Sequence, residues 1–151
     1  MNDTKQQLGW CSLEQSKKLI EAGLDLNTAD MTYTNESLHG VEYTSQFRVV
    51  PIKYNEYKEN FDKVKSMLQT PCFWEIYPCW SLGRLIELMP EIAMLVYDST
   101  GKIPSYFISI GPSESGEDIF LSEQYSTSIE AAVSTIIWLL ENNHIKKGKT
   151  K

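Results

Sequence analysis

The residues best suited to nucleophilic or metal chemistry in this chain are its three cysteines and two histidines. Cys72 and Cys79 are too far apart for the roughly two- to four-residue spacing of a zinc knuckle, and no cysteine or histidine follows closely to complete four ligands. We therefore expect no metal site. His39 lies in a polar stretch and His144 near the end of the chain, and we interpret both as solvent-exposed side chains rather than general bases.

A reactive cysteine needs a setting that favours the thiolate, such as the N-terminus of a helix. Cys79 comes shortly before Ser81, a candidate helix cap, which is a weak sign of such a setting. The alternative is an ordinary buried thiol. Together with Cys11 and Cys72 it makes an odd number of cysteines, which is typical of a reducing compartment and predicts free thiols.

The segment Gly111-Pro-Ser-Glu-Ser-Gly116 has the glycine spacing of a phosphate-binding loop. Such a loop needs Lys and then Ser or Thr at the next positions, but Glu117 and Asp118 stand there and would repel phosphate. The segment also resembles a nucleophile elbow, yet Ser115 occupies the last glycine position and a predicted strand follows instead of a helix. We interpret it as a hairpin connection, assign no catalytic residue and expect no cofactor.

The chain is acidic, with a formal net charge of −6, and four of its 14 Lys and Arg residues lie within residues 146–151. Within residues 86–130 the only base is Lys102. Nucleic-acid binding depends on Lys and Arg that neutralise phosphates, so this distribution argues against DNA or RNA as a partner, except through residues 146–151. A basic protein partner is electrostatically favoured. The acidic residues of the stretch are Glu87, Glu91, Asp98, Glu114, Glu117, Asp118, Glu123 and Glu130.

Apolar side chains make up 42% of the sequence, enough for a core of its own. No stretch approaches the roughly 18 apolar residues of a membrane span, and the first residues lack the apolar run of a signal peptide. We expect a cytoplasmic protein without membrane association. Its expected organisation is a single domain over residues 1–145 and a basic flexible tail over 146–151.

Local signals mark the elements of the first half of the chain. Ser12 and Gln15 have the pattern of a capping box and Gly23 is placed to end a helix, which predicts a helix over 13–22. Apolar residues three and four positions apart predict an amphipathic helix over 54–68. The expected extended segments are 31–34, 47–50 and the proline-flanked stretch 70–80.

In the second half, Ser81 predicts the cap of a helix that Pro90 stops, and Thr127 with Glu130 predicts the start of a final helix. Between these two helices we expect three strands, which are joined by short connections and must therefore form an antiparallel meander. We expect an α+β fold, in which this meander and one or two N-terminal strands form an antiparallel sheet with three to four helices, the last packed on the sheet. The expected meander strands are 93–97, 105–110 and 118–125.

The final helix carries an aromatic residue that its apolar stripe does not explain. Helical geometry places Trp138 opposite that stripe, beside Ala131 and near Thr135. The residues of the stripe are Ile129, Val133, Ile136, Ile137 and Leu140. Tryptophan is enriched at the centres of protein contacts. Two interpretations stay open: another segment of the chain covers the indole, or the indole centres a homodimer or a heteromeric contact.

Five blocks of the sequence carry a resemblance. They are Trp10-Cys-Ser-Leu-Glu-Gln-Ser-Lys-Lys-Leu-Ile-Glu-Ala-Gly, Asn27-Thr-Ala-Asp-Met-Thr-Tyr33, Cys79-Trp-Ser-Leu-Gly-Arg-Leu-Ile-Glu-Leu-Met-Pro90, Glu130-Ala-Ala-Val and Ile137-Trp-Leu-Leu-Glu-Asn-Asn-His-Ile145. These blocks resemble small uncharacterised proteins of Bacteroides-type bacteria, their phages and mobile elements. The resemblance implies a single cytoplasmic domain and an origin of this kind, and it brings no catalytic residue.

These observations favour a non-enzymatic protein-interaction or accessory protein. One alternative is an acidic immunity-type inhibitor of a basic toxin, such as a nuclease. Another is a small hydrolase or transferase that uses carboxylates and Cys79 in a cleft beneath residues 73–80. The candidate interaction residues are Trp138, Ala131 and Thr135 on the final helix and Glu114, Glu117, Asp118 and Glu123 in the acidic meander.

Overall fold

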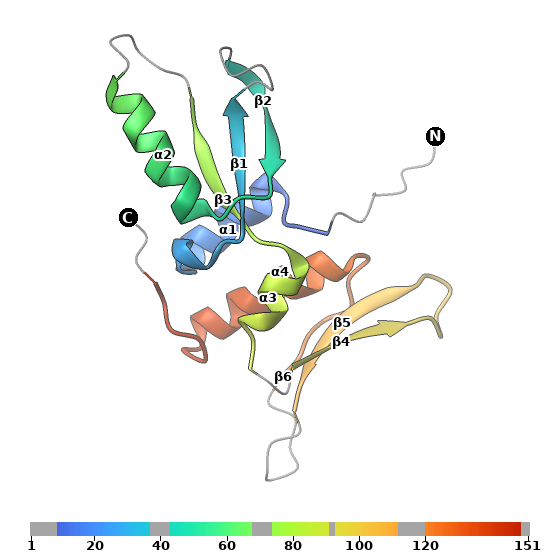
Figure 1. The fold of residues 1–151 in the computed structure, drawn as a ribbon. Coiled ribbons are helices and arrows are strands. Elements are labelled where there is room, and N and C mark those ends of the chain that lie inside the picture. Colours follow the sequence, from blue (N-terminus) through green and yellow to red (C-terminus); the bar gives the residue numbers. More distant parts are fainter. Residues whose placement is uncertain (1–8, 37–42, 68–73, 91–92, 112–119, 149–151) are drawn as a thin grey trace.

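The computed structural model describes residues 9–36, 43–67, 74–90, 93–111 and 120–148, the coloured part of the ribbon in Figure 1. The described strands form two small antiparallel sheets, which lie at opposite ends of the molecule with helices between them (Figure 1). None of the described helices is both long and apolar enough to cross a membrane.

The first helix, α1, spans Leu13–Ala22 and has the two ends that the sequence predicts. The Ser12 hydroxyl accepts a hydrogen bond from the Gln15 N–H at 3.1 Å, and the Gln15 side chain accepts one from the Ser12 N–H at 2.8 Å. These bonds satisfy amides that would otherwise lack partners at the start of the helix. Gly23 ends it with a φ of 100°, a left-handed conformation that favours glycine.

The N-terminal sheet has β1 (Met31–Glu36) at its centre, flanked by β2 (Tyr43–Val50) and β3 (Ile76–Cys79). Both pairs are antiparallel. The expected extended segments 31–34 and 47–50 are therefore confirmed as strands, and β1 and β2 extend further than the sequence indicated. Of the stretch 70–80, residues 76–79 form a strand, whereas 70–73 lie outside the described residues. The proline-flanked stretch supplies the third strand, because proline is tolerated at the edge of a sheet.

An aromatic stripe on α2 (Tyr54–Met67) packs against this sheet. Tyr54 and Phe61 are buried, and the Phe61 ring meets the ring of Trp74 edge-on at 4.7 Å between centroids. A short 3-10 helix, η1 (Leu26–Thr28), contacts α2 as well. The large rings on α2 thus serve the core rather than a binding platform.

The second sheet follows α3 (Leu82–Glu87), which begins after Ser81 as predicted. Its strands are β4 (Ala93–Asp98), β5 (Ser105–Ile110) and β6 (Phe120–Leu121), paired antiparallel in the order β4-β5-β6. The predicted meander is confirmed.

The last strand ends before the predicted residue 125, because a side chain interrupts the ladder; residues 118 and 119 lie outside the described residues. The Ser122 hydroxyl, instead of a backbone carbonyl, accepts the hydrogen bond of the Ile108 N–H at 2.8 Å. Backbone pairing returns further on, where Tyr106 and Tyr125 exchange two hydrogen bonds of 2.8 Å.

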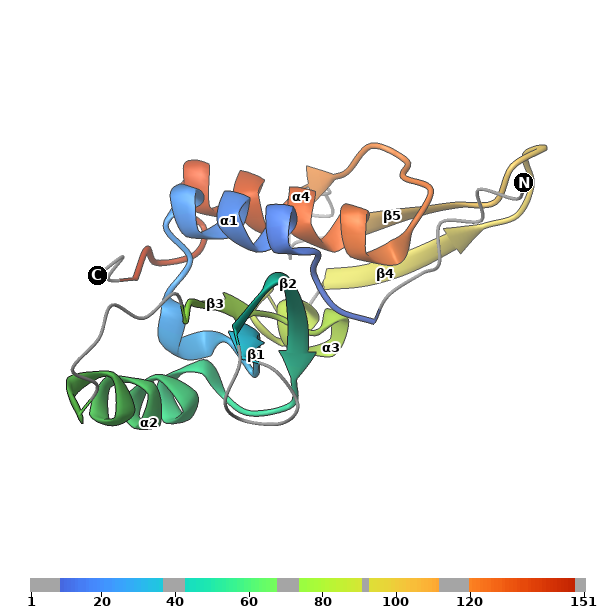
Figure 2. The ribbon, with the colours of Figure 1, turned by 90° about the horizontal axis from the view of Figure 1, so that it is seen from above.

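The final helix, α4 (Ser128–Glu141), contacts α1, α3 and β5. Figure 2 shows α1 and α4 side by side, with the β4–β5 hairpin projecting beyond them. The Thr127 hydroxyl accepts the Glu130 N–H at 3.2 Å, which confirms the predicted cap. Because elements surround α4, its side chains Ile136, Leu139 and Leu140 are all fully buried.

The α+β class, the antiparallel pairing and the packing of the last helix on a sheet are confirmed. The strands nevertheless belong to two sheets and not to one. Helices α1, α3 and α4 occupy the space between the sheets, so the N-terminal strands do not extend the meander (Figure 1).

The expected outward face of the final helix is wrong for Ala131 and Thr135. Both residues are 0% exposed. The expectation assumed a helix packed on one side, whereas α4 is packed on several. Thr135 satisfies its hydroxyl by donating to the Ala131 carbonyl at 2.8 Å, within the helix itself. These two residues form part of the core and offer no surface to a partner.

Part of the expected C-terminal tail packs against the rest of the chain. The Gly148 N–H donates a hydrogen bond of 2.9 Å to the Gly23 carbonyl, beside the end of α1. A Cβ at position 148 would lie 2.2 Å from the Cβ of Asp25, so only glycine allows this approach. Residues 149–151 of that tail lie outside the described residues.

Candidate functional site

A polar cleft of about 460 Å³ lies where three elements begin. Asp30 immediately precedes β1, Lys53 immediately precedes α2, and Ser81 and Arg84 belong to the start of α3. The cleft contains serine, carboxylates and cations, and is therefore the first place to look for catalysis.

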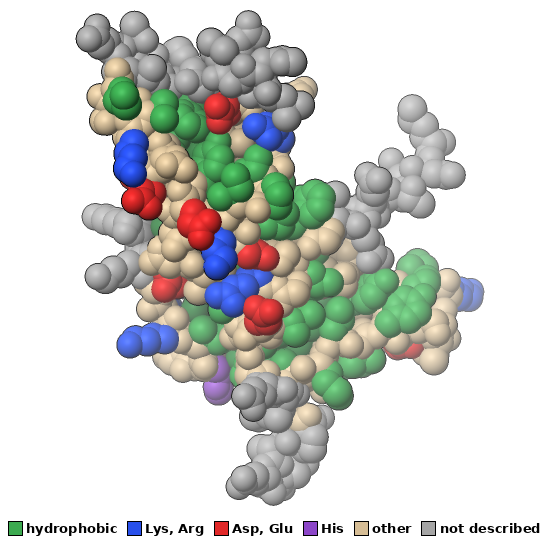
Figure 3. All heavy atoms as spheres, viewed as in Figure 1, with side chains coloured by type: hydrophobic (Ala, Val, Ile, Leu, Met, Phe, Trp, Pro, Cys, Tyr) green, Lys and Arg blue, Asp and Glu red, His purple; other side chains and the backbone are tan. Residues whose placement is uncertain are grey.

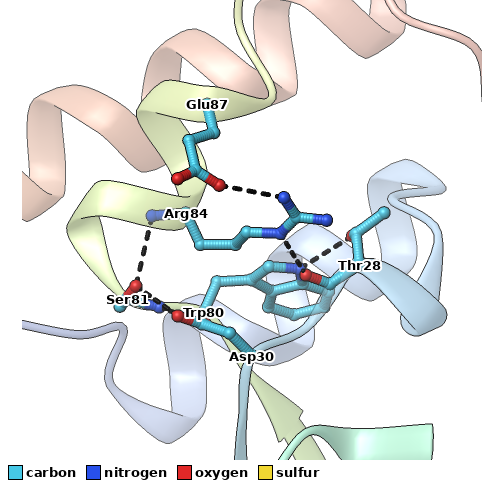
Figure 4. A network of polar contacts seen from close by, with 6 residues as sticks. All are labelled: Thr28, Asp30, Trp80, Ser81, Arg84 and Glu87. Atoms are coloured by element: carbon cyan, nitrogen blue, oxygen red, sulfur yellow. Dashed lines mark hydrogen bonds and ion pairs between the residues drawn. The ribbon is translucent and has the colours of Figure 1, made fainter.

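The serine of this cleft is engaged in holding the fold together. The Ser81 N–H and hydroxyl donate to the Asp30 carboxylate at 2.9 and 2.5 Å, and the hydroxyl accepts the Arg84 N–H at 3.1 Å (Figure 4). A serine nucleophile is usually activated by histidine. His144, the histidine in the described part of the chain, stacks on Trp138 instead, at 5.1 Å between rings. Ser81 therefore serves as a helix cap.

Arg84, the arginine of the cleft, also makes its hydrogen bonds within the chain. Its Nε donates to the Thr28 carbonyl at 2.8 Å, and its Nη1 donates to Glu87 at 3.0 Å. Beneath it the buried Trp80 indole N–H donates to the Thr28 hydroxyl at 3.0 Å (Figure 4). The network joins α3 to η1, and the cleft thus has the character of a polar joint between elements.

Two of the cysteines lie deep in the core beside each other. Cys11 and Cys79 are free thiols with no exposure, and the Cys79 thiol donates to the Cys11 carbonyl at 3.6 Å. Tyr33 donates to the same carbonyl at 2.6 Å. Burial raises the pKa of Cys11 to about 12 and raises that of Cys79 as well, so both thiols are protonated at neutral pH. Of the two interpretations of Cys79, the structure supports the ordinary buried thiol. Cys72 lies outside the described residues.

No metal centre is built by the part of the chain that the structure describes. Within it, no three side chains of histidine, cysteine, aspartate or glutamate come together as a set of metal ligands.

The indole of Trp138 is half-buried, and its cover comes from the same chain. It stacks on Phe120 at 4.3 Å with an interplanar angle of 25°, and on His144 with an angle of 12°. Phe120 lies on the side of its sheet that packs on the core. Trp138 therefore joins α4 to the β4-β5-β6 sheet.

Of the acidic residues predicted to meet a partner, Glu123 lies in the described chain and is exposed. Glu114, Glu117 and Asp118 lie outside the described residues. Glu123 stands next to Gln124, whose side chain donates to Asp98 at 3.3 Å. Gln124 therefore links this segment to Asp98 on β4, and Glu123 precedes it as an exposed acidic residue.

The second sheet has one face against the core and one facing solvent. Ile108 and Ile110 of β5 are fully buried, and their partners on β4 are Leu95 and Ala93. Because side chains alternate along a strand, the residues between them face the other way. We call this second face the outer apolar face and define it by Met94, Val96, Phe107 and Leu121.

Residues of this face are neighbours across the strands. Val96 pairs with Phe107, and Met94 and Leu121 both pair with Ser109. Met94 is 58% exposed and Leu121 61% exposed. Large exposed hydrophobic residues also lie elsewhere on the hairpin, at Tyr97 and Ile103, and Figure 3 shows hydrophobic side chains gathered along it.

Sequence reasoning missed this face, although the sequence holds a signal for it. Strand β4 has apolar residues on both of its sides, Met94 and Val96 on one and Leu95 and Tyr97 on the other. A strand that packs on one side alternates apolar and polar residues, whereas β4 does not. The polar joint around Asp30 had no such signal, because its partners are far apart in sequence.

No protein-family model, no curated protein and no solved structure matches the chain. Its function must therefore be argued from its own residues.

Proposed function

We propose that this chain is a non-enzymatic protein-binding domain whose docking surface is the outer apolar face. The observation that carries the proposal is the exposure of Met94 and Leu121 beside the Val96–Phe107 pair, on a sheet whose other face is already packed. Contiguous apolar side chains on a soluble domain mark a place where another surface docks. When a partner covers these apolar side chains, they form the core of the interface and exclude water from it.

Charge at the border of the face indicates the chemistry of that partner. Hydrogen bonds from the hydroxyl and the N–H of Thr100 lower the pKa of Asp98, so this carboxylate stays ionised even in mildly acidic solution. Glu123, an exposed residue next in sequence to the Gln124 that contacts Asp98, carries a further negative charge. We propose a protein partner with an apolar patch and a basic rim, because opposite rim charges speed association and fix orientation.

Two features of the described chain support binding over catalysis. The pKa of Cys11 and of Cys79 is raised by burial, which keeps both thiols protonated. Ser81 donates its hydroxyl proton to Asp30 as part of a helix cap. Cys79 is the nucleophile that the hydrolase or transferase alternative would use, and its thiol is protonated; Ser81, the serine of the polar cleft, serves as a helix cap.

The proposal is tested by photo-crosslinking with a benzophenone side chain at position 94, in a lysate of the native host. The matched control carries the same group in place of Lys63, a solvent-exposed side chain on α2. We expect one basic protein to be crosslinked from position 94 and not from position 63, with a yield that falls as salt is raised. Excess wild-type chain should compete for it, whereas excess Leu121→Gln should compete poorly.

Equal labelling from both positions would overturn the docking surface, as would equal competition by the two chains. A product made only of two copies of this chain, with no basic protein crosslinked from position 94 at low salt, would overturn the basic partner. The inhibitor alternative demands one more result: the crosslinked protein must have a toxic activity that the wild-type chain suppresses and Leu121→Gln suppresses less.

A further inference from the structure

The sheet edges of the described chain differ in how they are protected against pairing with another strand. Edge strands are usually kept apart by short length, proline, charged residues or a bulge. Strand β3 has four residues and includes Pro78, and the described part of β6 ends where the Ser122 side chain interrupts the ladder. Strand β2 carries Arg48, and its pairing with β1 shifts register between Thr34 and Glu36. Each of these edges has at least one protecting feature.

Strand β4 has none of them along its central residues. It pairs with β5 over six consecutive residue pairs without a register shift, and its sequence from Ala93 to Tyr97 contains neither a charge nor a proline. No other described strand lies along its free side, and the hairpin projects from the body of the molecule (Figure 2). It is therefore a regular edge that is uncharged from Ala93 to Tyr97.

The hydrogen-bond pattern shows which backbone groups this edge presents. Tyr106 exchanges both of its backbone hydrogen bonds with Tyr125, on the β6 side. Its partner on β4, Tyr97, therefore belongs to a non-hydrogen-bonded pair, and the N–H and C=O of Tyr97 point to the free side. The same holds for Leu95 two residues earlier. No described residue donates to or accepts from these groups of Leu95 and Tyr97.

We propose that the β4 edge pairs antiparallel with β4 of a second copy of this chain, across a two-fold axis normal to the sheet. Such an axis keeps the outer faces of both copies on the same side. Placing Leu95 at the axis centres the pairing on the uncharged part of the strand. Leu95 then lies opposite the partner subunit's Leu95, and Met94 lies opposite the partner subunit's Val96.

The charges of the strand agree with a second copy as occupant. Every residue pair along the centre of the pairing between the two β4 strands would be apolar. The Asp98 carboxylates would lie at opposite ends, about 20 Å apart at the usual rise per residue. That separation exceeds the Debye length of about 8 Å at physiological salt, so the two charges barely repel each other. The pairing would also join the two outer apolar faces into one surface, and it stands independently of the proposed function.

The first test is the mass of the chain in solution, measured by light scattering and sedimentation over a wide range of concentration. We expect the wild type to reach twice the monomer mass. Tyr97→Pro removes an outward N–H without breaking a bond between β4 and β5, and we expect it to stay monomeric. The matched control Tyr97→Ala also loses the ring contact with Tyr106 but keeps the N–H, and it should still form the dimer.

A monomeric wild type at every concentration would overturn the inference, as would equal association of Tyr97→Pro and Tyr97→Ala. If Tyr97→Pro fails to fold, Met94→Lys decides, because a lysine on this exposed position protects an edge without touching the core. Unchanged association of Met94→Lys would then overturn it.

The register has its own test in disulfide formation. A hydrogen-bonded antiparallel pair places its Cα atoms about 5.5 Å apart, within the range of a disulfide. Under mild oxidation Leu95→Cys should therefore form a covalent dimer, whereas Asp98→Cys, at the far end of the pairing, should not. Equal crosslinking of both variants would overturn the proposed pairing. A heterologous strand bound at this edge, with no covalent dimer of Leu95→Cys, would overturn it as well.

Discussion

Asp30 and Ser81 are joined by two hydrogen bonds across 51 residues of sequence, one from the Ser81 N–H and one from its hydroxyl. Asp30 immediately precedes the central strand of the N-terminal sheet, and Ser81 caps α3. The pair therefore fixes the start of α3 against the start of β1. The hydroxyl has two roles at once, because it also accepts the Arg84 N–H.

We predict that Asp30→Ala lowers the free energy of unfolding by about 1–3 kcal/mol, since it leaves the N–H and hydroxyl of Ser81 without their acceptor. Ser81→Ala should lower it by about 0.5–2 kcal/mol through loss of the cap. The double variant should lose less than the sum, because both changes remove one shared contact. Urea denaturation of the four chains measures this, and strict additivity would contradict the pairing.

The buried thiols should resist modification in the folded protein. In a Cys72→Ser background, we expect Cys11 and Cys79 to react with a thiol reagent at pH 8 far more slowly than in the denaturant-unfolded chain, because burial keeps them protonated and inaccessible. A chromogenic disulfide reagent measures the rate. Labelling of either thiol at the rate of the unfolded chain would contradict the described core.

The raised pKa of the thiols also predicts a loss of stability in alkali. The unfolded Cys11 thiol ionises near its ordinary pKa of 9.0, whereas burial raises the pKa in the folded chain to about 12, so the stabilisation is complete below pH 9 and is lost between these values. The free energy of unfolding should fall by about 1.4 kcal/mol per pH unit for this thiol. Denaturation of the wild type and of Cys11→Ala at pH 8 to 10 checks it. A constant difference between them would be the wrong outcome.

Two glycines should respond oppositely to the same substitution. Gly23 has a φ of 100°, and an added Cβ would lie 3.1 Å from the Lys147 side chain, so Gly23→Ala should destabilise by about 1–2 kcal/mol. Gly83 lies in α3 with nothing within 4 Å of an added Cβ. Gly83→Ala should therefore be neutral or stabilise by up to about 1 kcal/mol. Thermal denaturation compares them, and an equal loss in both would contradict the described end of α1.

Removal of the Trp138 indole should affect stability and leave assembly unchanged. We expect Trp138→Ala to lose about 2–3 kcal/mol, less than the roughly 3–5 kcal/mol of a fully buried tryptophan. Trp138→Phe should retain most of the stacking on Phe120 and His144. Urea denaturation measures the loss, and light scattering should give both variants the mass of the wild type. A change of mass in Trp138→Ala alone would favour the contact with a partner that the sequence left open.

The parts of the fold that depend on near neighbours follow from the sequence. Ser12 and Gly23 bound α1, Thr127 starts α4, and short connections require the meander. Each signal acts within a few residues, where spacing determines geometry. The division of the strands between two sheets depends on which elements meet over long distances, and no local pattern encodes that.

The candidate site was predicted less well, for the same reason. Ala131 and Thr135 were assigned to a surface from helical spacing, which says which residues share a face but not how many faces are covered. Asp30 and Arg84 take part in contacts that join distant segments. The outer apolar face could have been found, because Met94 and Val96 break the alternation of a half-buried strand.

The central place of α4 has a consequence for how the protein is made. The ribosome synthesises this helix after α1, α3 and β5, yet all three pack against it. Until it emerges, Leu19, Leu85 and Ile108 have no common neighbour to shield them from water, and a nascent chain in that condition is a substrate for chaperones. A premature stop before Ser128 would therefore abolish the fold rather than shorten it.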